Sequence, residues 1–303
     1  MADFVSDFWH WFIIVPTVIG ILALFPLIYA NRGDKVTGDN ADTTGHVWDD
    51  DLEELNNPLP GWWLNMFVIT IVFSIVYLIL YPGLGHFEGV LGWSSRGQYE
   101  SQVDTAEKTY GPLYQKYAAI DIKTLAKDPA ALNTGERLFA NYCTVCHGSD
   151  ARGARGYPNL RDQNWLYGGE PDQINASILN GRNGVMPGWV TVLGTDGVLD
   201  VTEYVVSLSG RDHDTGVAAR GKVHFDSTCA ACHQTDGTGN HALGAPNLAD
   251  RIWLYGGSKK SIIESIAAGR SGNMPAHGEF LGEDRVHLLA TYVYSLSQDL
   301  ENE

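Results

Sequence analysis

Residues 143–147 read CTVCH and residues 229–233 read CAACH. These two copies of Cys-x-x-Cys-His hold all four cysteines of a chain of 303 residues. Two thiols separated by two residues and followed at once by a histidine form a compact set of reactive and metal-binding groups. The kind of site that this repeated motif forms therefore determines what the surrounding chain folds around.

Four kinds of site compete for a motif of this spacing. In covalent haem attachment the thiols bond to the haem and the histidine ligates its iron, which is the usual meaning of Cys-x-x-Cys-His. Zinc ribbons place their cysteine pairs about 15 to 20 residues apart, but here residues 147–228 separate the pairs. A thioredoxin-like site expects a βαβ setting, and thiols so close make strained disulfides. Because both copies carry the histidine, we predict two covalently bound c-type haems, one on Cys143 and Cys146 and one on Cys229 and Cys232.

The motifs belong to an internal repeat that extends to the end of the chain. The cysteine pairs are related by an offset of 86 residues, and two inserted residues in the second copy raise the offset to 88 for the later segments. A repeat of this length indicates two copies of one small domain. Three segments recur at the larger offset: Pro-Asn-Leu at 158–160 and 246–248, Trp-Leu-Tyr-Gly-Gly at 165–169 and 253–257, and Gly-Arg-x-Gly-x-Met-Pro at 181–187 and 269–275.

Each copy has the pattern of a small helical domain. A first helix leads into the cysteines, Gly-rich turns come next, and apolar residues at helical spacing predict a last helix at 197–209 and at 283–297. Domains of about 80 to 90 residues bury little core on their own, so a large apolar cofactor inside each would stabilise it. We therefore predict an all-α fold with one cytochrome c domain at 131–210 and a second at 211–303.

A six-coordinate haem iron needs a second axial ligand, usually Met or His. The chain has four methionines, of which Met186 and Met274 follow the motif histidines by 39 and 41 residues. In the second copy His241 and His277 are competing candidates, but the repeat favours Met274. The predicted axial pairs are His147 with Met186 in the first domain and His233 with Met274 in the second.

Other repeated side chains suggest contacts with the haem. Arg182 and Arg270 precede each methionine by four residues, and we predict that they pair with haem propionates; the alternative is a pair of solvated surface arginines. Trp165 and Trp253 are expected to pack in the domain cores with some propionate contact. The sequence has no Gly-rich phosphate loop, no His-Glu-x-x-His and no nucleophile motif. With both axial positions filled, the remaining chemistry is one-electron transfer.

Two uncharged stretches precede the repeat. Residues 12–29 and 62–81 are each about long enough to cross the roughly 30 Å hydrocarbon core of a bilayer, and aromatic residues flank both. A buried core helix is the alternative for either, and a cleaved signal peptide for the first, although its start lacks basic residues. The loop between them holds Arg32 and Lys35, which favours a cytoplasmic loop. We predict a membrane anchor at 1–82 with the rest of the chain outside.

The chain carries a formal net charge of −16 at pH 7. Such a charge repels nucleic acid and favours basic protein partners through electrostatic steering. An acidic surface kept only for solubility is the other explanation. We expect protein partners and the lipid bilayer, and no nucleic acid.

The spacing of motif, proline and methionine resembles that of class I c-type cytochromes. In that class the carbonyl of a proline accepts the Nδ1 proton of the motif histidine and fixes its ring. Pro158 and Pro246 follow their motif histidines by 11 and 13 residues. The resemblance implies this role for both prolines.

The N-terminal third narrows the resemblance. The stretches WDDDLEELNNPLPGWW at 48–63 and YPGLGHFEGVLGWSSRGQYE at 81–100 are similar to signature segments of the di-haem subunit III (CcoP/FixP) of cbb3-type cytochrome c oxidases. Some members of that family have only the second membrane helix, so the packing partner of the first stays open. On this resemblance residues 83–130 link the haem domains to the anchor and dock them onto partner subunits; a partly helical spacer is the alternative.

The resemblance implies an electron-transfer subunit of a proton-translocating respiratory oxidase, without an active site of its own. Such a subunit takes electrons from a soluble or membrane-bound c-type donor and passes them, through a mono-haem subunit, towards the haem-copper centre where oxygen is reduced. It implies the bacterial cytoplasmic membrane, with the haem domains in the periplasm. The alternatives are a membrane-bound di-haem carrier, the cytochrome subunit of a periplasmic dehydrogenase or nitric oxide reductase, and a di-haem peroxidase, which needs one open iron position.

Overall fold

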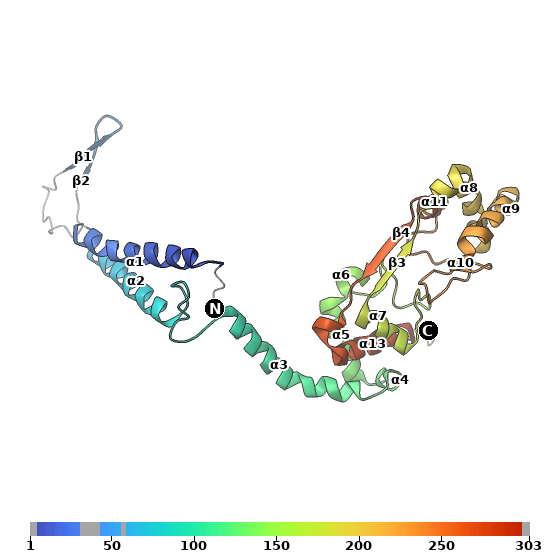
Figure 1. Cartoon of the computed structure of the whole chain (residues 1–303), viewed down its shortest axis with the longest axis horizontal. Coiled ribbons are helices and arrows are strands. Elements are labelled where there is room, and N and C mark those ends of the chain that lie inside the picture. Colours follow the sequence, from blue (N-terminus) through green and yellow to red (C-terminus); the bar gives the residue numbers. More distant parts are fainter. Residues whose placement is uncertain (1–4, 31–42, 56–58, 299–303) are drawn as a thin grey trace. The chain divides into compact units, whose positions relative to one another are not determined.

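The computed structural model describes residues 5–30, 43–55 and 59–298. These residues are mostly helical and form two compact units that divide between Lys108 and Thr109 (Figure 1). Four short strands among them make two separate two-stranded sheets. The predicted all-α class is confirmed, with these two small strand pairs added to it.

The first unit contains the two apolar helices. α1 (Asp7–Ala30) and α2 (Gly61–Leu80) are both long and apolar enough to cross a membrane. Of all the residues in these two helices only Ile71 is buried within the protein. Apolar side chains that point outward along a whole helix suit contact with lipid, whereas a soluble core helix would bury them. The spans predicted at 12–29 and 62–81 fall on these helices.

A hairpin lies between the two helices, where the sequence predicts only a loop. β1 (Thr43–Trp48) and β2 (Leu52–Leu55) pair antiparallel. In the turn between them Asp49 and Asp50 have positive φ angles of 48° and 73°, a conformation that Asp tolerates better than most residues. These two aspartates therefore form the turn of the hairpin.

The second unit carries both cysteine motifs, and the long helix α3 (Ser95–Ala118) runs into it from the first unit. In each half of the second unit a helix precedes the motif, and a helix, a strand and a long last helix come after it. The repeat seen in the sequence is therefore present in the structure. The first half holds α4 (Ile122–Leu125), α5 (Pro129–Tyr142), α6 (Thr144–His147), α7 (Pro171–Asn180), β3 (Arg182–Met186) and α8 (Val190–Leu208). The second half holds α9 (Thr215–His224), the π-helical turn η1 (Phe225–Cys229), α10 (Ala230–His233), α11 (Lys259–Ala268), β4 (Arg270–Met274), α12 (Gly278–Leu281) and α13 (Glu283–Gln298).

The last helices of the two halves are exchanged. α5 packs against α13, and α8 packs against α9 and α11 (Figure 1). What we call the first core consists of buried residues within 117–178 and 281–296. The second core consists of buried residues within 198–206 and 225–266. Each half therefore supplies its last helix to the core that holds the other half's motif.

The chain crosses between the two cores along β3 and β4, which pair antiparallel and lie side by side in Figure 1. Just after β3, Trp189 donates its backbone N–H to the carbonyl of Ile266 in α11. Just after β4, His277 donates its backbone N–H to the carbonyl of Ile178 in α7. Each strand thus leads from one core to the other. The domain limit predicted near residue 210 separates the two copies of the repeat and stays a prediction. The two packed cores do not follow this limit, because each contains helices of both copies.

A glycine and a tyrosine make a close helix contact in each core. In the first core a Cβ atom on Gly135 of α5 would lie 2.7 Å from Cβ of Tyr292 on α13. In the second core a Cβ atom on Gly221 of α9 would lie 3.0 Å from Cβ of Tyr204 on α8 and would overlap the carbonyl oxygen of Asp200. Because Tyr204 belongs to the first half and Tyr292 to the second, both cores make the same contact with exchanged partners.

Gly221→Ala should destabilise the second core, because the added methyl group meets the backbone of Asp200 and a side-chain movement cannot relieve the overlap. The expected loss is about 1–3 kcal/mol of unfolding free energy, which circular dichroism in detergent would detect as a lower Tm. Gly216→Ala on the same helix is the matched control, since its Cβ would only approach Asp214 Oδ1 at 3.4 Å. Equal Tm values for the two variants would contradict the contact.

Candidate haem-binding sites

The histidine of each motif is buried and held through one ring nitrogen. His147 at the end of α6 and His233 at the end of α10 are 8% and 7% exposed. Their Nδ1 atoms each lie 3.1 Å from a proline carbonyl oxygen, that of Pro158 for His147 and that of Pro246 for His233. A carbonyl oxygen only accepts, so each Nδ1 carries the proton and each Nε2 keeps its lone pair. Both rings are therefore arranged as neutral ligands for a metal ion.

Burial favours the uncharged form of the groups in both motifs. It lowers the pKa of His147 and of His233 below the ordinary value, although the proline carbonyls act in the opposite direction. Burial also raises the pKa of the Cys143 thiol to about 11 and raises the pKa of the Cys229 thiol. At neutral pH these groups are uncharged, which suits the binding of a large apolar cofactor.

Each motif turns one thiol towards a core and one outward. Cys143 packs against the first core and Cys229 belongs to the second, whereas Cys146 and Cys232 are exposed. None of the four forms a disulfide. The two thiols of a motif lie within about one helical turn, so they can reach two substituents of one bound molecule, as covalent haem attachment needs.

The methionines lie in the opposite cores from those predicted. Met274 packs against the first core, as Cys143 does, and Met186 packs against the second core. His277, three residues after Met274, interacts electrostatically with His147 and lowers its pKa further. The structure therefore places neither methionine with the motif histidine of its own repeat.

The predicted axial pairs, His147 with Met186 and His233 with Met274, thus differ from what the structure brings together. The cause is the crossing of the two strands. Met186 is the last residue of β3 and Met274 is the last residue of β4, so each methionine arrives in the core to which its strand leads. Chain order pairs each methionine with the motif of its own repeat, whereas the packing groups it with the motif of the other repeat.

Arg182 and Arg270 are engaged by protein groups. In the register of β3 and β4 each lies opposite the methionine of the other repeat. Nε of Arg182 donates to Ser177 Oγ at 2.9 Å, and Nε of Arg270 donates to Ser265 Oγ at 2.9 Å. Each guanidinium also lies over a tyrosine ring, with its Cζ 4.7 Å from the ring centroid. Their pairing with propionates stays a prediction.

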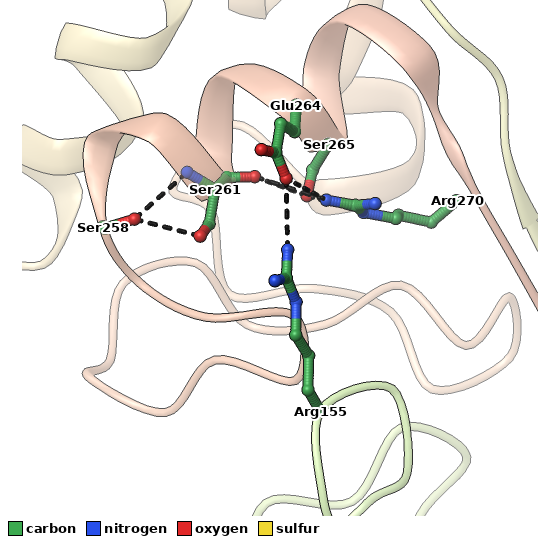
Figure 2. Close-up of polar contacts among 6 residues, drawn as sticks. All are labelled: Arg155, Ser258, Ser261, Glu264, Ser265 and Arg270. Atoms are coloured by element: carbon green, nitrogen blue, oxygen red, sulfur yellow. Dashed lines mark hydrogen bonds and ion pairs between the residues drawn. The ribbon is translucent and has the colours of Figure 1, made fainter.

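Arg270 differs from Arg182 in having a carboxylate partner. Figure 2 shows Glu264 of α11 between two arginines, with its Oε2 3.1 Å from Nη2 of Arg155 and 3.7 Å from Nη2 of Arg270. Arg155 belongs to the first repeat, so the carboxylate also connects the two repeats. The first repeat has Ala176 at the position equivalent to Glu264, so this arrangement occurs in one copy only.

The two tryptophans of the repeat pack against the two cores. Trp165 is half-buried against the first core, and Trp253 is half-buried against the second. Each therefore borders the core that holds the cysteines of its own repeat. Their predicted contact with propionates stays a prediction.

Two arginines that the repeat does not reveal carry buried donors. Among the described residues, three buried side-chain atoms lack a hydrogen-bond partner: Nε of Arg161, Nε of Arg211 and Oδ1 of Asn175. In the alignment of the two copies Arg161 is equivalent to Ala249, and Arg211 to Asp299. Both arginines occur in one copy only, as do several others, so a comparison of the two copies does not single them out.

Together these groups fit two c-type haems. Each core combines a buried histidine with its Nε2 lone pair, a methionine, one thiol at the core and one exposed thiol. Unpaired guanidinium nitrogens in addition suit the carboxylates of such a cofactor. The groups that would hold the haems are Cys143, Cys146 and His147 at the first core and Cys229, Cys232 and His233 at the second.

Comparison with known protein families gives matches over most of the chain. Residues 40–88 match the N-terminal domain of the cytochrome oxidase-cbb3 protein FixP. Residues 130–205 and 216–293 each match the family described as cytochrome c oxidase, cbb3-type, subunit III. The two matches to the second family fall on the two copies of the repeat.

Individual relatives align over nearly their whole length. The cbb3-type cytochrome c oxidase subunit CcoP of Rubrivivax gelatinosus is 46% identical over 300 residues, which are 98% of each chain. The subunit FixP of Bradyrhizobium diazoefficiens is 41% identical over 282 residues, covering 87% of this chain and 96% of that one. The subunit CcoP of Cereibacter sphaeroides is 39% identical over 277 residues, covering 84% of this chain and 94% of that one.

Proposed function

Because the chain belongs to the CcoP/FixP family of cbb3-type cytochrome c oxidase subunits, we propose that it passes single electrons from a c-type donor towards the haem-copper centre of such an oxidase. Family membership confirms the resemblance predicted from residues 48–63 and 81–100. The matches over both repeats confirm that the predicted all-α domains are cytochrome c domains. The chain is a cytochrome c subunit of an oxidoreductase complex.

The observation that supports electron transfer is the grouping of one methionine with one motif cysteine in each core, Met274 with Cys143 and Met186 with Cys229, together with the burial of both motif histidines. When bound, the haem supplies an iron that changes oxidation state by one electron. We propose His147 and Met274 as the axial ligands in the first core, and His233 and Met186 in the second. If both residues of each pair held the iron of a bound haem, no coordination position would be left for a substrate.

The proline carbonyls set how the histidines act. The carbonyl of Pro158 keeps the proton of His147 on Nδ1, so the lone pair of Nε2 stays available to the iron. The carbonyl of Pro246 does the same for His233. These hydrogen bonds also fix the orientation of each ring, which limits the rearrangement that accompanies a change of oxidation state.

We place the haem domains in the periplasm, attached by α1 and α2 to the bacterial cytoplasmic membrane. Arg32 and Lys35 stand in the segment between these helices, and such positive residues favour the cytoplasmic side. All the haem-binding residues come after α2, so they lie on the other side. The partners are the catalytic haem-copper subunit, a mono-haem cytochrome c subunit and the donor; the net charge of −16 favours a basic donor.

In a gentle detergent extract of membranes, the chain should co-purify with a haem-copper subunit and a mono-haem cytochrome. Mass spectrometry of the complex would identify the partners, and the intact mass of this chain after denaturation should include two haems. The matched control replaces Cys143 and Cys146 by alanine and should retain one haem and the same partners. Recovery of the unmodified chain alone, or with a dehydrogenase, would exclude the oxidase.

A further inference from the structure

We propose that Arg211 and Arg251 form a carboxylate-binding site, and that the carboxylate is a propionate of the haem in the second core. Neither arginine is suggested by the repeat, since neither has an arginine at the equivalent position of the other copy. The proposal rests on the proposed function in one respect, the presence of a haem at the second motif.

The two arginines line a cavity at the edge of the second core. The cavity has a volume of about 500 Å³ and is lined by Arg211, Arg251, Trp253 and Gly257. Trp253 packs against the second core, which includes Cys229. The cavity therefore borders the place where the second motif would hold its haem.

Arg211 is fixed in position and has an unused donor. Its Nη1 donates to the carbonyl oxygen of Gly257, and its guanidinium lies over the ring of Trp253 with Cζ 5.5 Å from the centroid. Its Nε is buried and has no partner among the described residues. A buried donor without a partner is rare in native proteins, and a guanidinium stays charged at any physiological pH. The Nε donor of Arg211 thus suits a ligand that brings a hydrogen-bond acceptor, preferably an anionic one.

No carboxylate of the described residues supplies this acceptor. Arg211 and Arg251 form no ion pair within 4.0 Å with any Asp or Glu of the described ranges, whereas Arg270 pairs with Glu264 (Figure 2). Arg270 is thus already partly neutralised, and its Nε is taken by Ser265. The half-buried Arg211 and the exposed Arg251 line one cavity without a counter-charge and favour a planar carboxylate, which a guanidinium binds through two parallel hydrogen bonds.

The first core is built differently at the same place. Gln163 stands where the second copy has Arg251, and its Nε2 donates to the carbonyl of Ser297 at 2.6 Å. At the position equivalent to Arg211 the sequence has Asp299. Two cations of the second site are therefore replaced by a neutral and an acidic residue. Arg211 and Arg251 thus give the second core two arginines at positions where the first copy has none.

The experiment is a redox titration of the intact complex carrying Arg211→Gln. Loss of a cation beside the haem should favour the oxidised iron, shifting the reduction equilibrium of the second haem about tenfold, or about 59 mV for one electron. The midpoint of the second haem should also become more pH-dependent, because its propionate loses the partner that keeps it ionised. The first haem is the internal reference. Lys260→Gln, which removes an exposed charge from α11, is the matched control and should shift neither midpoint.

The variant Arg211→Lys keeps the charge without the guanidinium fork and should give a smaller shift with the haem retained. A second-haem midpoint and pH dependence equal to wild type in Arg211→Gln would overturn the proposal. If Arg211→Gln does not fold, a second-haem midpoint and pH dependence equal to wild type in Arg211→Lys would overturn the proposal. A midpoint that moves with added inorganic phosphate in the wild type would identify a free anion and also overturn it. Absence of haem from the second motif of the unmodified chain would instead refute the proposed function.

Discussion

Met274→Ala should remove an axial ligand from the haem of the first motif, residues 143–147, and Met186→Ala from the haem of the second, residues 229–233. Each methionine would then ligate the haem of the other repeat, whereas the order of the motifs along the chain would pair it with the haem of its own repeat. This exchange is expected because β3 and β4 carry each methionine into the core that holds the other repeat's cysteines. The loss of a methionine sulfur from a haem iron lowers its potential strongly, so the effect is large and is confined to one haem.

The two haems can be distinguished by removing one. In a chain with Cys143→Ala and Cys146→Ala only the second motif carries haem, so Met186→Ala should abolish the methionine-to-iron charge-transfer band while Met274→Ala leaves it. The midpoint should fall by about 0.1 V or more, part of the roughly 0.8 V over which axial ligands tune haem potentials. If Met274→Ala abolished the band in this background, the ligands would follow chain order and the exchanged assignment would be wrong.

A chain that ends at Gly210 should fail to form a stable first haem domain, although it contains the whole first repeat. Such a chain lacks α13, and with it a large part of the first core. Burial of a Val or Leu side chain contributes roughly 1.5–3 kcal/mol, so several of them together equal the about 5–15 kcal/mol that stabilises an ordinary domain. The buried Val and Leu side chains lost with α13 are Val286, Leu288, Leu289, Val293 and Leu296.

The truncated chain should accumulate poorly and bind little haem, as measured by haem staining and limited proteolysis. A full-length chain with a protease site inserted after Asp212 is the control. Once it has folded, cleavage there should leave the two halves associated in non-denaturing detergent, because each half holds the other's last helix. A truncated chain with a normal methionine-ligated spectrum, or cleaved halves that separate on gel filtration, would show that each repeat folds alone.

Features that depend on neighbouring residues could be predicted from the sequence. The spacing of Cys143, Cys146 and His147 places them within about one helical turn whatever surrounds them. An uncharged stretch such as residues 12–29 needs only its own length and composition to be recognised as a membrane helix. The resemblance to class I c-type cytochromes then implied the role of Pro158, whose carbonyl oxygen lies 3.1 Å from His147 Nδ1.

The pairing of the helices could not be predicted, and the repeat itself is the reason. Gly135 and Gly221 are equivalent, as are Tyr204 and Tyr292, so each glycine has two equally suitable partners. The choice between them depends on the path of β3 and β4 over long range, which no local pattern encodes. The predicted axial pairs rest on the same assumption, that each repeat packs on its own. Arg211 was missed for the opposite reason, because it occurs in one copy only.

The packing of α13 into the first core sets an order of events while the chain is being made. About 150 residues separate Cys146 from Gln298 at the end of α13, so synthesis at about 5–20 residues per second takes roughly 8–30 s to cover that distance. During this interval the first motif exists without the helix that covers it. The buried residues of the second core end at Ile266, so that core can close earlier. The motif that emerges first from the ribosome thus belongs to the core that is completed last.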